Sequence, residues 1–266
     1  MLENVHRFTH GEIEGAVIRI MEDEFLSTHE FLPDELKLGD PEESIFSYTC
    51  CYLRYRGKPV LIDAGFDPDT APGALESIDV DAKEIEVVLL THADRDHVAG
   101  LLMPDGSFTY PNAQHVIGRE LWENLRKPET LDALDEERAA FYRRFVDAFD
   151  DHLQLCEGEI EVEVLPGARF ASSPGHRIGH AIYEFDSGSG APLLHTGDTF
   201  FDSMYAEHPD WPNVADSLPD QAIASRIGVV ERAVASGALV LSSHVEFPGI
   251  GRIERQGEFY RWVPVP

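Results

Sequence analysis

The chain has 266 residues, and its 49 acidic residues against 21 basic ones give a formal net charge of −28. A field of this sign repels phosphate backbones and anionic membrane surfaces, so we expect a small-molecule substrate and neither nucleic acid nor a membrane as a partner. A composition poor in lysine and rich in carboxylates suits a salt-adapted protein and an ordinary acidic protein equally well. The sequence leaves open whether the protein forms a homodimer.

The cysteines argue against a disulfide framework. Cys50 and Cys51 are adjacent in an apparent strand and therefore point to opposite faces, and Cys156 leaves an odd number. A reducing compartment is favoured. The N-terminus has no apolar signal region, and no apolar run reaches transmembrane length. We therefore expect a cytoplasmic protein and, from the length and the lack of a linker, a single domain over residues 1–266.

Hydrophobic spacing predicts an α/β chain. Strands are predicted in the first half at residues 11–20, in a hairpin formed by 46–57 and 58–65, at 87–90 and at 111–118. Helices are predicted at 73–85, 119–125 and 131–149. In the second half, strands are predicted at 160–165, 181–185, 192–196 and 239–242, with an amphipathic helix at 219–236. Two β-rich halves predict a sandwich of two sheets with helices outside.

Metal-ligand residue types crowd the end of the strand at 87–90. Within six residues the chain places His92, Asp94, Asp96 and His97. Imidazole with carboxylate is the ligand mix of zinc, iron or manganese sites. Three later segments each add a His or Asp at a predicted strand end beside Gly, Pro or Ser: Ser173–His176, His195–Asp198 and Ser242–Gly249, the last containing His244.

Together these segments, from about Tyr48 to the C-terminus, resemble the metal-binding signature of the metallo-β-lactamase superfamily. The resemblance implies a four-layer αβ/βα sandwich with two mixed sheets, and a helical insert at about 119–150 that covers the active site. It implies one metal position bound by His92, Asp94 and His176, a second bound by Asp96, His97 and His244, and Asp198 bridging both. Asp96 and Asp198 would be catalytic. Asp63 would orient a ligand, or would simply be a turn aspartate before glycine.

Asp94 departs from the family pattern His-X-His-X-Asp-His, in which its position is the second histidine. Two divalent ions are expected, with zinc as the first choice. Because a carboxylate is a harder ligand than imidazole, Asp94 shifts the preference of the first position towards manganese or iron. Three carboxylates with two divalent ions and a bridging hydroxide also give a neutral ligand shell, one charge below the usual +1. We therefore expect weaker Lewis acidity.

The C-terminal half looks like the lactonase and organophosphate-hydrolase branch of the superfamily. In that reading a metal-bridged hydroxide attacks a neutral ester, lactone or phosphotriester. The alternatives are a non-haem iron oxidoreductase of the same fold and a non-catalytic metal-binding protein. An aromatic set would form an apolar substrate wall or would only pack strand ends to helices: Phe200, Phe201, Trp211 and Phe247. Tyr205 would reach the oxyanion or lie at the surface.

Overall fold

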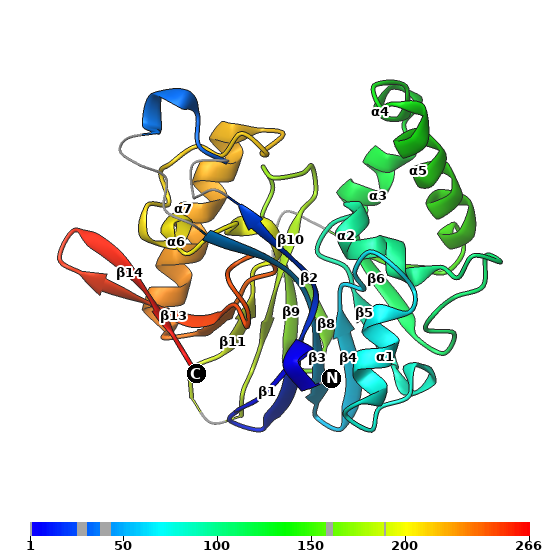
Figure 1. Cartoon of the computed structure of the whole chain (residues 1–266), viewed down its shortest axis with the longest axis horizontal. Helices are drawn as coiled ribbons and strands as arrows, with labels where there is room; N and C mark the ends of the chain where they lie inside the picture. Colours follow the sequence, from blue (N-terminus) through cyan, green and yellow to red (C-terminus); the bar gives the residue numbers. More distant parts are fainter. Residues whose placement is uncertain (1, 26–30, 38–43, 158–161, 189) are drawn as a thin grey trace.

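In the computed structural model, the described residues are 2–25, 31–37, 44–157, 162–188 and 190–266. They form two seven-stranded sheets that face each other, with helices on both outer sides (Figure 1). This arrangement confirms the predicted α/β fold class and the four-layer sandwich. None of the helices in these ranges is long and apolar enough to cross a membrane.

The first sheet has the strand order β1 to β7. Its first four strands form an antiparallel meander, whereas β4, β5, β6 and β7 are parallel neighbours. Parallel strands need crossover connections, and the helices of this half supply them. The strands are β1 (Val5–His10), β2 (Ile13–Phe25), β3 (Ser44–Tyr55), β4 (Lys58–Ile62), β5 (Val87–Leu89), β6 (Gln114–Gly118) and β7 (Leu153–Cys156). The helices are α1 (Thr70–Glu76), α2 (Arg95–Val98), α3 (Arg119–Leu125), α4 (Pro128–Asp132) and α5 (Glu136–Phe149).

The second sheet has the order β14 to β8 and is antiparallel except for the pair β11 and β12. The crossover between that pair carries α6 (Met204–Glu207) and α7 (Pro219–Ser236). Its strands are β8 (Val162–Leu165), β9 (Ala168–Ser172), β10 (Ala181–Phe185), β11 (Leu193–His195), β12 (Leu239–Leu241), β13 (Ile250–Gln256) and β14 (Phe259–Pro264). Short 3-10 turns lie at Leu2–Asn4, Asp34–Leu36, Ala82–Glu84, Ala99–Leu101 and Gly197–Thr199.

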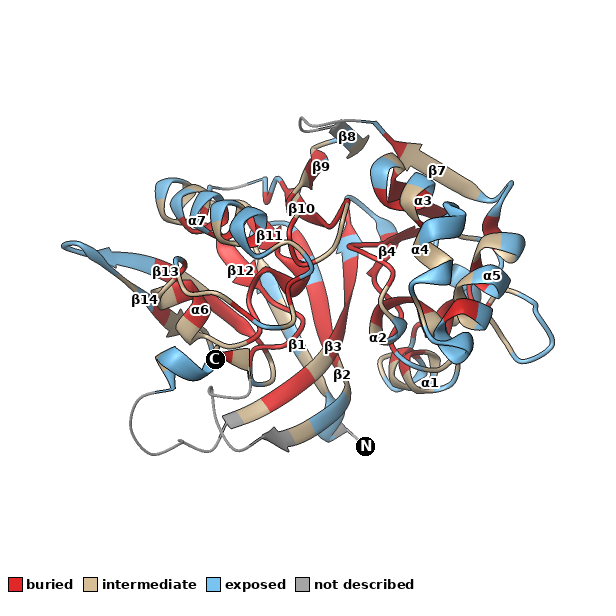
Figure 2. Ribbon diagram, turned by 90° about the horizontal axis from the view of Figure 1, so that it is seen from above, coloured by how far each residue is buried: buried red, intermediate tan, exposed pale blue. Residues whose placement is uncertain are grey.

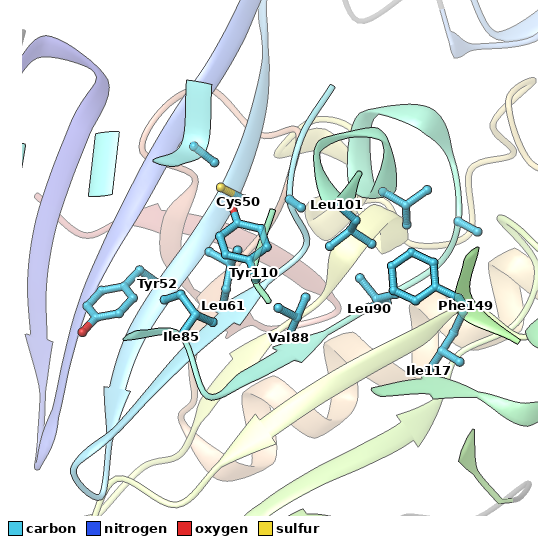
Figure 3. Packing of buried hydrophobic residues seen from close by; sticks show 14 of the residues in the cluster. Cys50, Tyr52, Leu61, Ile85, Val88, Leu90, Leu101, Tyr110, Ile117 and Phe149 are labelled. Carbon is cyan, nitrogen blue, oxygen red and sulfur yellow. The ribbon is translucent and has the colours of Figure 1, made fainter. Parts of the chain in front are cut away.

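Three apolar layers hold these elements together. Successive strand residues alternate between layers, so that Leu61 and Val88 face the helices α1 to α5 while Ile62 and Leu89 face the other sheet. Figure 3 shows the first of these layers, with Val88 and Leu90 beside Leu61. The third layer joins the second sheet to α7. Buried residues accordingly line the centre of the molecule in Figure 2, with the exposed sides of the helices outermost.

The cysteines follow the same alternation. Cys50 belongs to the layer under the helices and Cys51 to the layer between the sheets, and both are fully buried. Cys156 is also buried, and all three are free thiols. Burial raises the pKa of the Cys156 thiol to about 11, so it stays protonated at neutral pH. The prediction of unpaired core thiols is confirmed.

Two predicted helices have different bounds in the structure. The helix expected at 73–85 is instead α1 and a separate 3-10 turn at Ala82–Glu84, because Asp79 takes a left-handed φ of 63° that ends the helical path. The helix expected at 131–149 is split into α4 and α5, where the Asp135 side chain caps α5 by accepting from the Arg138 N–H. Of the strand expected at 160–165, residues 160–161 lie outside the described ranges.

Candidate metal centre

The predicted ligand residues follow the ends of four strands. His92 and Asp94 lie in the loop after β5, and Asp96 and His97 in the short helix α2 that continues it. His176 lies between β9 and β10, Asp198 after β11, and His244 after β12. The first cluster comes from one sheet and the other three residues from the second sheet, so the centre forms only when both sheets are packed.

The side chains form two groups that share Asp198. One group is Asp96, His97, Asp198 and His244, the other is His92, His176 and Asp198, and within each group the ligand atoms lie within 4.8 Å of one another. His97 Nε2 is 3.2 Å from Asp198 Oδ1, while His244 Nε2 is 3.0 Å and His176 Nε2 is 3.3 Å from Asp198 Oδ2. Asp198 Oδ2 therefore lies near histidines of both groups and Oδ1 near His97, so the two groups share this carboxylate.

Each histidine of these groups presents Nε2 to the centre because its Nδ1 is already engaged. Hydrogen bonds of this kind fix the ring orientation of metal-binding histidines. The acceptors are Asp63 for His97 at 2.8 Å, Asp216 for His176 at 3.3 Å, the Ser47 carbonyl for His244 at 3.0 Å and the Thr91 hydroxyl for His92 at 3.1 Å. Of these partners only Asp63 was foreseen from the sequence.

Unpartnered buried atoms point into the centre. His92 Nε2, His97 Nε2 and His176 Nε2 are buried without a hydrogen-bond partner, and so is Asp198 Oδ1. Buried polar atoms are normally paired, and four orphans in one place are costly. Two divalent cations, one for each group, would accept electron pairs from these atoms. The residues present therefore fit the ligand set of a metal centre.

The electrostatics of the centre keep its carboxylates ionised. Burial alone would raise the pKa of Asp198, but the imidazoles of His244, His97 and His92 hold it well below the usual range. Burial acts against protonation of His97, yet Asp198, Asp96 and Asp63 raise its pKa well above the usual value. Metal binding must displace that proton, so uptake of a cation should release protons.

Asp63 occupies the turn and also contacts His97, one of the predicted ligands. It is buried with a left-handed φ of 58°. Its carboxylate accepts from the Thr91 backbone N–H at 2.9 Å and the Thr91 hydroxyl at 2.8 Å, besides His97. His180 supports Asp198 similarly, since its Nε2 accepts from the Asp198 N–H at 3.1 Å.

Asp94 is held by an arginine that the sequence reasoning missed. Arg177 Nε lies 2.9 Å from Asp94 Oδ1, and Arg177 Nη2 lies 2.6 Å from Oδ2. The positive charge of Arg177 compensates the carboxylate, so the expected neutral ligand shell is an incomplete account. The sequence did contain a signal for this contact. A basic residue, Arg177, directly follows the predicted ligand His176, and Asp94 is an acidic residue at a position where the family pattern has histidine.

A cavity of about 600 Å³ opens beside Asp94 and Asp96. Helices α3, α4 and α5 supply much of its lining, and they form the projecting lobe that Figure 1 draws in green. Apolar side chains from this lobe and nearby loops alternate with polar ones. The apolar lining is Phe66, Ala93, Leu121, Leu125, Leu134 and Ile178, and the polar lining includes Asn124, Thr130, Arg138, Tyr142 and Arg177.

The aromatic wall expected from Phe200, Phe201, Trp211 and Phe247 does not line this cavity. Phe200 and Phe201 are buried in the layer under α7, and the Phe201 ring packs 5.2 Å from the His176 ring. Trp211 stacks on His208 at 4.2 Å. Tyr205 is fully buried and donates to the Phe31 carbonyl, so it is neither at the surface nor free to contact an oxyanion. These residues pack elements together.

A family model described as the metallo-β-lactamase superfamily matches residues 46–242. The chain belongs to this superfamily. The match includes every predicted ligand except His244, which follows two residues later. Membership, with the two-sheet fold, supports the coarse assignment of a hydrolase of the metallo-β-lactamase fold.

Several solved structures share the whole fold. AidC, a dizinc quorum-quenching lactonase, has a TM-score of 0.85 at 20% identity, with 99% of this chain and 98% of AidC covered. The hydrolase AbOPH has a TM-score of 0.82 at 18% identity, covering 100% and 99%. An N-acyl homoserine lactone hydrolase has a TM-score of 0.65 at 16% identity, covering 91% and 100%. At these identities the likeness establishes the fold alone.

The curated relatives found by sequence are named as endoribonucleases, unlike the structural neighbours. Endoribonuclease YSH1 of Mycosarcoma maydis is 29% identical over 168 residues, covering 56% of this chain and 18% of the relative. Endoribonuclease ysh1 of Schizosaccharomyces pombe is 32% identical over 167 residues, covering 56% and 20%. The chain thus spans about a fifth of the length of these curated relatives.

These relatives contradict the expectation that the charge rules out nucleic acid, because proteins named as endoribonucleases share sequence with this chain. The exclusion was wrong for a physical reason. Net charge describes the long-range field of the molecule, whereas the substrate is selected by the local surroundings of the centre.

Proposed function

We propose that this protein is a metal-dependent hydrolase of a small ester or lactone, with phosphotriesters as further substrates of the same site. The observation that carries the proposal is the cavity of about 600 Å³ that is lined by Asp96 of one ligand group and by Asp94 beside the other. Small-molecule sites are typically 300–1,000 Å³, mostly apolar, with a few placed polar groups. Leu121 and Leu125 of α3, with Leu134 between α4 and α5, suit an acyl or aryl group. Tyr142 and Asn124 suit its polar end.

We propose His92, Asp94, His176 and Asp198 as holders of one divalent ion and Asp96, His97, His244 and Asp198 as holders of the other, with zinc as the first candidate. When bound, such ions would activate water and polarise a carbonyl or phosphoryl oxygen. Asp96 lies at the boundary between the centre and the cavity, with its side chain 16% exposed. It can therefore accept the proton that the attacking water loses. The apolar lining limits competing water around the ester.

The second candidate is a phosphodiesterase acting on RNA. It is favoured by the sequence relatives named as endoribonucleases, one of them 32% identical over 167 residues. The three arginines of the cavity lining, Arg95, Arg138 and Arg177, would suit a phosphate. Arg95 and Arg177 are engaged by Glu137 and Asp94, which leaves Arg138 with only a 3.5 Å contact to Asp135.

A substrate panel tests the two candidates. Zinc-loaded protein is assayed with acyl lactones, aryl esters, a phosphotriester and a single-stranded RNA, in parallel with Asp96→Asn. We expect lactone or ester turnover that Asp96→Asn lowers at least a hundredfold, since proton transfer typically contributes that much. RNA cleavage that is lost in Asp96→Asn, without ester turnover, would favour the second candidate. Turnover of none of the four by metal-loaded protein would contradict the proposal.

A further inference from the structure

Arg177, which pairs with Asp94, is also held by hydrogen bonds to backbone carbonyls. Arg177 Nη1 donates to the carbonyls of His176 and Ala215, each at 2.8 Å, while Nε and Nη2 bind the two Asp94 oxygens. A planar guanidinium with these contacts has one orientation. It ties Asp94 from the loop after β5 to the loop that carries His176. The two loops come from different sheets.

Although Arg177 binds both oxygens of Asp94, one of them, Oδ2, also lies near His92 and His176. Its Oδ2 lies 3.7 Å from His92 Nε2 and 3.6 Å from His176 Nε2. Asp198 Oδ2 lies 3.6 Å and 3.3 Å from the same two nitrogens. Four ligands placed about 2.1 Å from one ion in a tetrahedron would be roughly 3.4 Å apart. The four separations between these two carboxylates and these two histidines are close to that value, although Asp94 lies outside the group whose ligand atoms are all within 4.8 Å of one another.

Charge explains why an arginine accompanies this aspartate. A histidine at position 94 would be a neutral ligand, whereas Asp94 alone would add one negative charge. Arg177 returns the charge to that of a histidine through two hydrogen bonds, the strongest form of arginine–carboxylate pairing. Both side chains are partly shielded, with exposed fractions of 33% for Arg177 and 23% for Asp94. Solvent therefore screens the pair only in part.

We propose that Arg177 is a positioning residue for Asp94, and that the two side chains act as one neutral unit which replaces a histidine at the His92/His176 metal position. This metal position should then bind zinc with similar affinity when Asp94 and Arg177 are both present or both replaced, and more weakly when only Asp94 is replaced by histidine. This inference rests on the metal centre of the proposed function but not on its substrate.

The test is a double-variant cycle read by zinc content and zinc affinity. Wild type, Asp94→His, Arg177→Met and the double variant are equilibrated with a zinc-buffering chelator. We expect two zinc ions per chain in wild type. Asp94→His alone should weaken the less tightly held zinc at least tenfold, because an uncompensated arginine then lies beside a neutral ligand and a cation. Adding Arg177→Met should restore that affinity to within about threefold of wild type.

The decisive comparison is the effect of Arg177→Met in the Asp94→His background. If Arg177 only held loops together, losing its backbone contacts would weaken zinc binding further, and that result would overturn the proposal. Asp94→Asn with and without Arg177→Met repeats the comparison should the histidine variant fold poorly, because asparagine keeps the shape of the aspartate.

Arg138→Met, combined with Asp94→His, is the matched control from the same cavity and should restore nothing. Wild-type protein that binds no zinc would overturn this inference together with the proposed metal centre. Two bound zinc ions without lactone or ester turnover would affect only the proposed substrate.

Discussion

At the residue scale, Asp198 is the group on which both ligand sets depend. Asp198→Ala removes the carboxylate shared by the two groups, so two cations would face each other without a bridging charge. We expect the variant to retain at most one metal ion per chain and to lose metal-dependent turnover. His97→Ala should behave similarly. Elemental analysis of dialysed protein checks this, with the exposed His152→Ala as control. Two retained ions and full activity in Asp198→Ala would refute the ligand assignment.

Asp63 allows a test of ligand orientation without removing a ligand. Asp63→Asn keeps the size and tolerates the left-handed φ of 58°. It replaces a charged acceptor of His97 Nδ1 and Thr91 by a neutral amide. Loss of such partners typically costs about 10- to 100-fold in metal affinity, and we expect a loss in that range. Asp79→Asn, at another left-handed aspartate with a φ of 63°, should leave affinity unchanged. Equal affinities in both variants would show that Asp63 serves only the turn.

His115 offers a test away from the metal centre. Burial lowers the pKa of this β6 histidine to about 4, with a further contribution from His152. Below about pH 6.5, His115 therefore binds a proton in the unfolded chain, whereas in the folded chain it stays neutral down to about pH 4. The free energy of unfolding accordingly falls as the pH decreases through this window. The slope from one such group is about 1.4 kcal/mol per pH unit.

His115→Phe should remove this contribution. In urea unfolding at pH 7 and pH 5, wild type should lose about 2 kcal/mol more than the variant on acidification. The comparison is the difference between the two pH values within each protein, so any packing change caused by phenylalanine cancels. Parallel losses in both proteins would mean that His115 is protonated in the folded state over this range.

At the element scale, the loop that carries His176 depends on close contact with α7. Gly175 has a φ of 133°, and a Cβ there would lie 2.1 Å from the Ala222 backbone nitrogen. Gly175→Ala must therefore shift the loop or the helix start, at a cost on the order of 1–3 kcal/mol, and should displace His176. We expect lower thermal stability and loss of one metal ion.

Gly228→Ala is the matched control within α7 itself. A Cβ at Gly228 would meet nothing within 4 Å. Because alanine is the better residue in a helix interior, this variant should be more stable than wild type by about 0.5–1 kcal/mol, with unchanged metal content. Calorimetry with metal analysis of both variants checks the pair. A Gly175→Ala protein that gains stability like Gly228→Ala would contradict the close approach.

The elements with strong local signals were predictable from the sequence. The helix predicted at 219–236 is α7 with the same bounds, and that at 119–125 is α3. Burial on α7 does not follow residue type alone, because Ile227 is 39% exposed whereas Arg226 is buried. Arg226 is buried because Asp216 pairs with it at 2.9 Å, a contact that residue-type spacing does not reveal. Strands β1, β7, β9, β13 and β14 were missed because their identity depends on pairing.

In the candidate metal centre, too, the residues with local sequence signals were predictable and those with distant partners were not. Residues of the ligand segments were predictable because type and spacing repeat a known pattern within short stretches. Their supporting partners were not, because Ser47 reaches His244 across 197 residues and Asp216 reaches His176 across 40. Contacts of this sequence separation exist only once the two sheets meet. Asp63 was the exception, since it ends a recognisable strand just upstream of the ligand cluster.

At the scale of the whole molecule, the net charge of −28 does not describe the charges that line the cavity. A chain of net charge −28 lines its cavity with Arg95, Arg138 and Arg177, besides Asp94 and Asp96. The long-range field slows the approach of anions, but inside the cavity the nearest charges dominate because fields in salt decay over about 8–10 Å. This is why the net charge failed to exclude nucleic acid as a partner class.

The same net charge predicts a salt-dependent stability. With 49 acidic and 21 basic residues, like charges repel in the folded state more than in the expanded chain, and salt screens that repulsion. We expect the midpoint of thermal unfolding to rise between 10 mM and 1 M NaCl, most steeply up to roughly 0.2 M, where the Debye length falls below typical surface separations. Sucrose of matched osmolarity stabilises by exclusion without screening, so it isolates the charge effect. A midpoint that is equal in low and high NaCl would mean that the exposed ion pairs already balance the surplus carboxylates. Continued stabilisation beyond 1 M NaCl, where screening is complete, would instead favour the salt-adapted reading of this surface over that of an ordinary acidic protein.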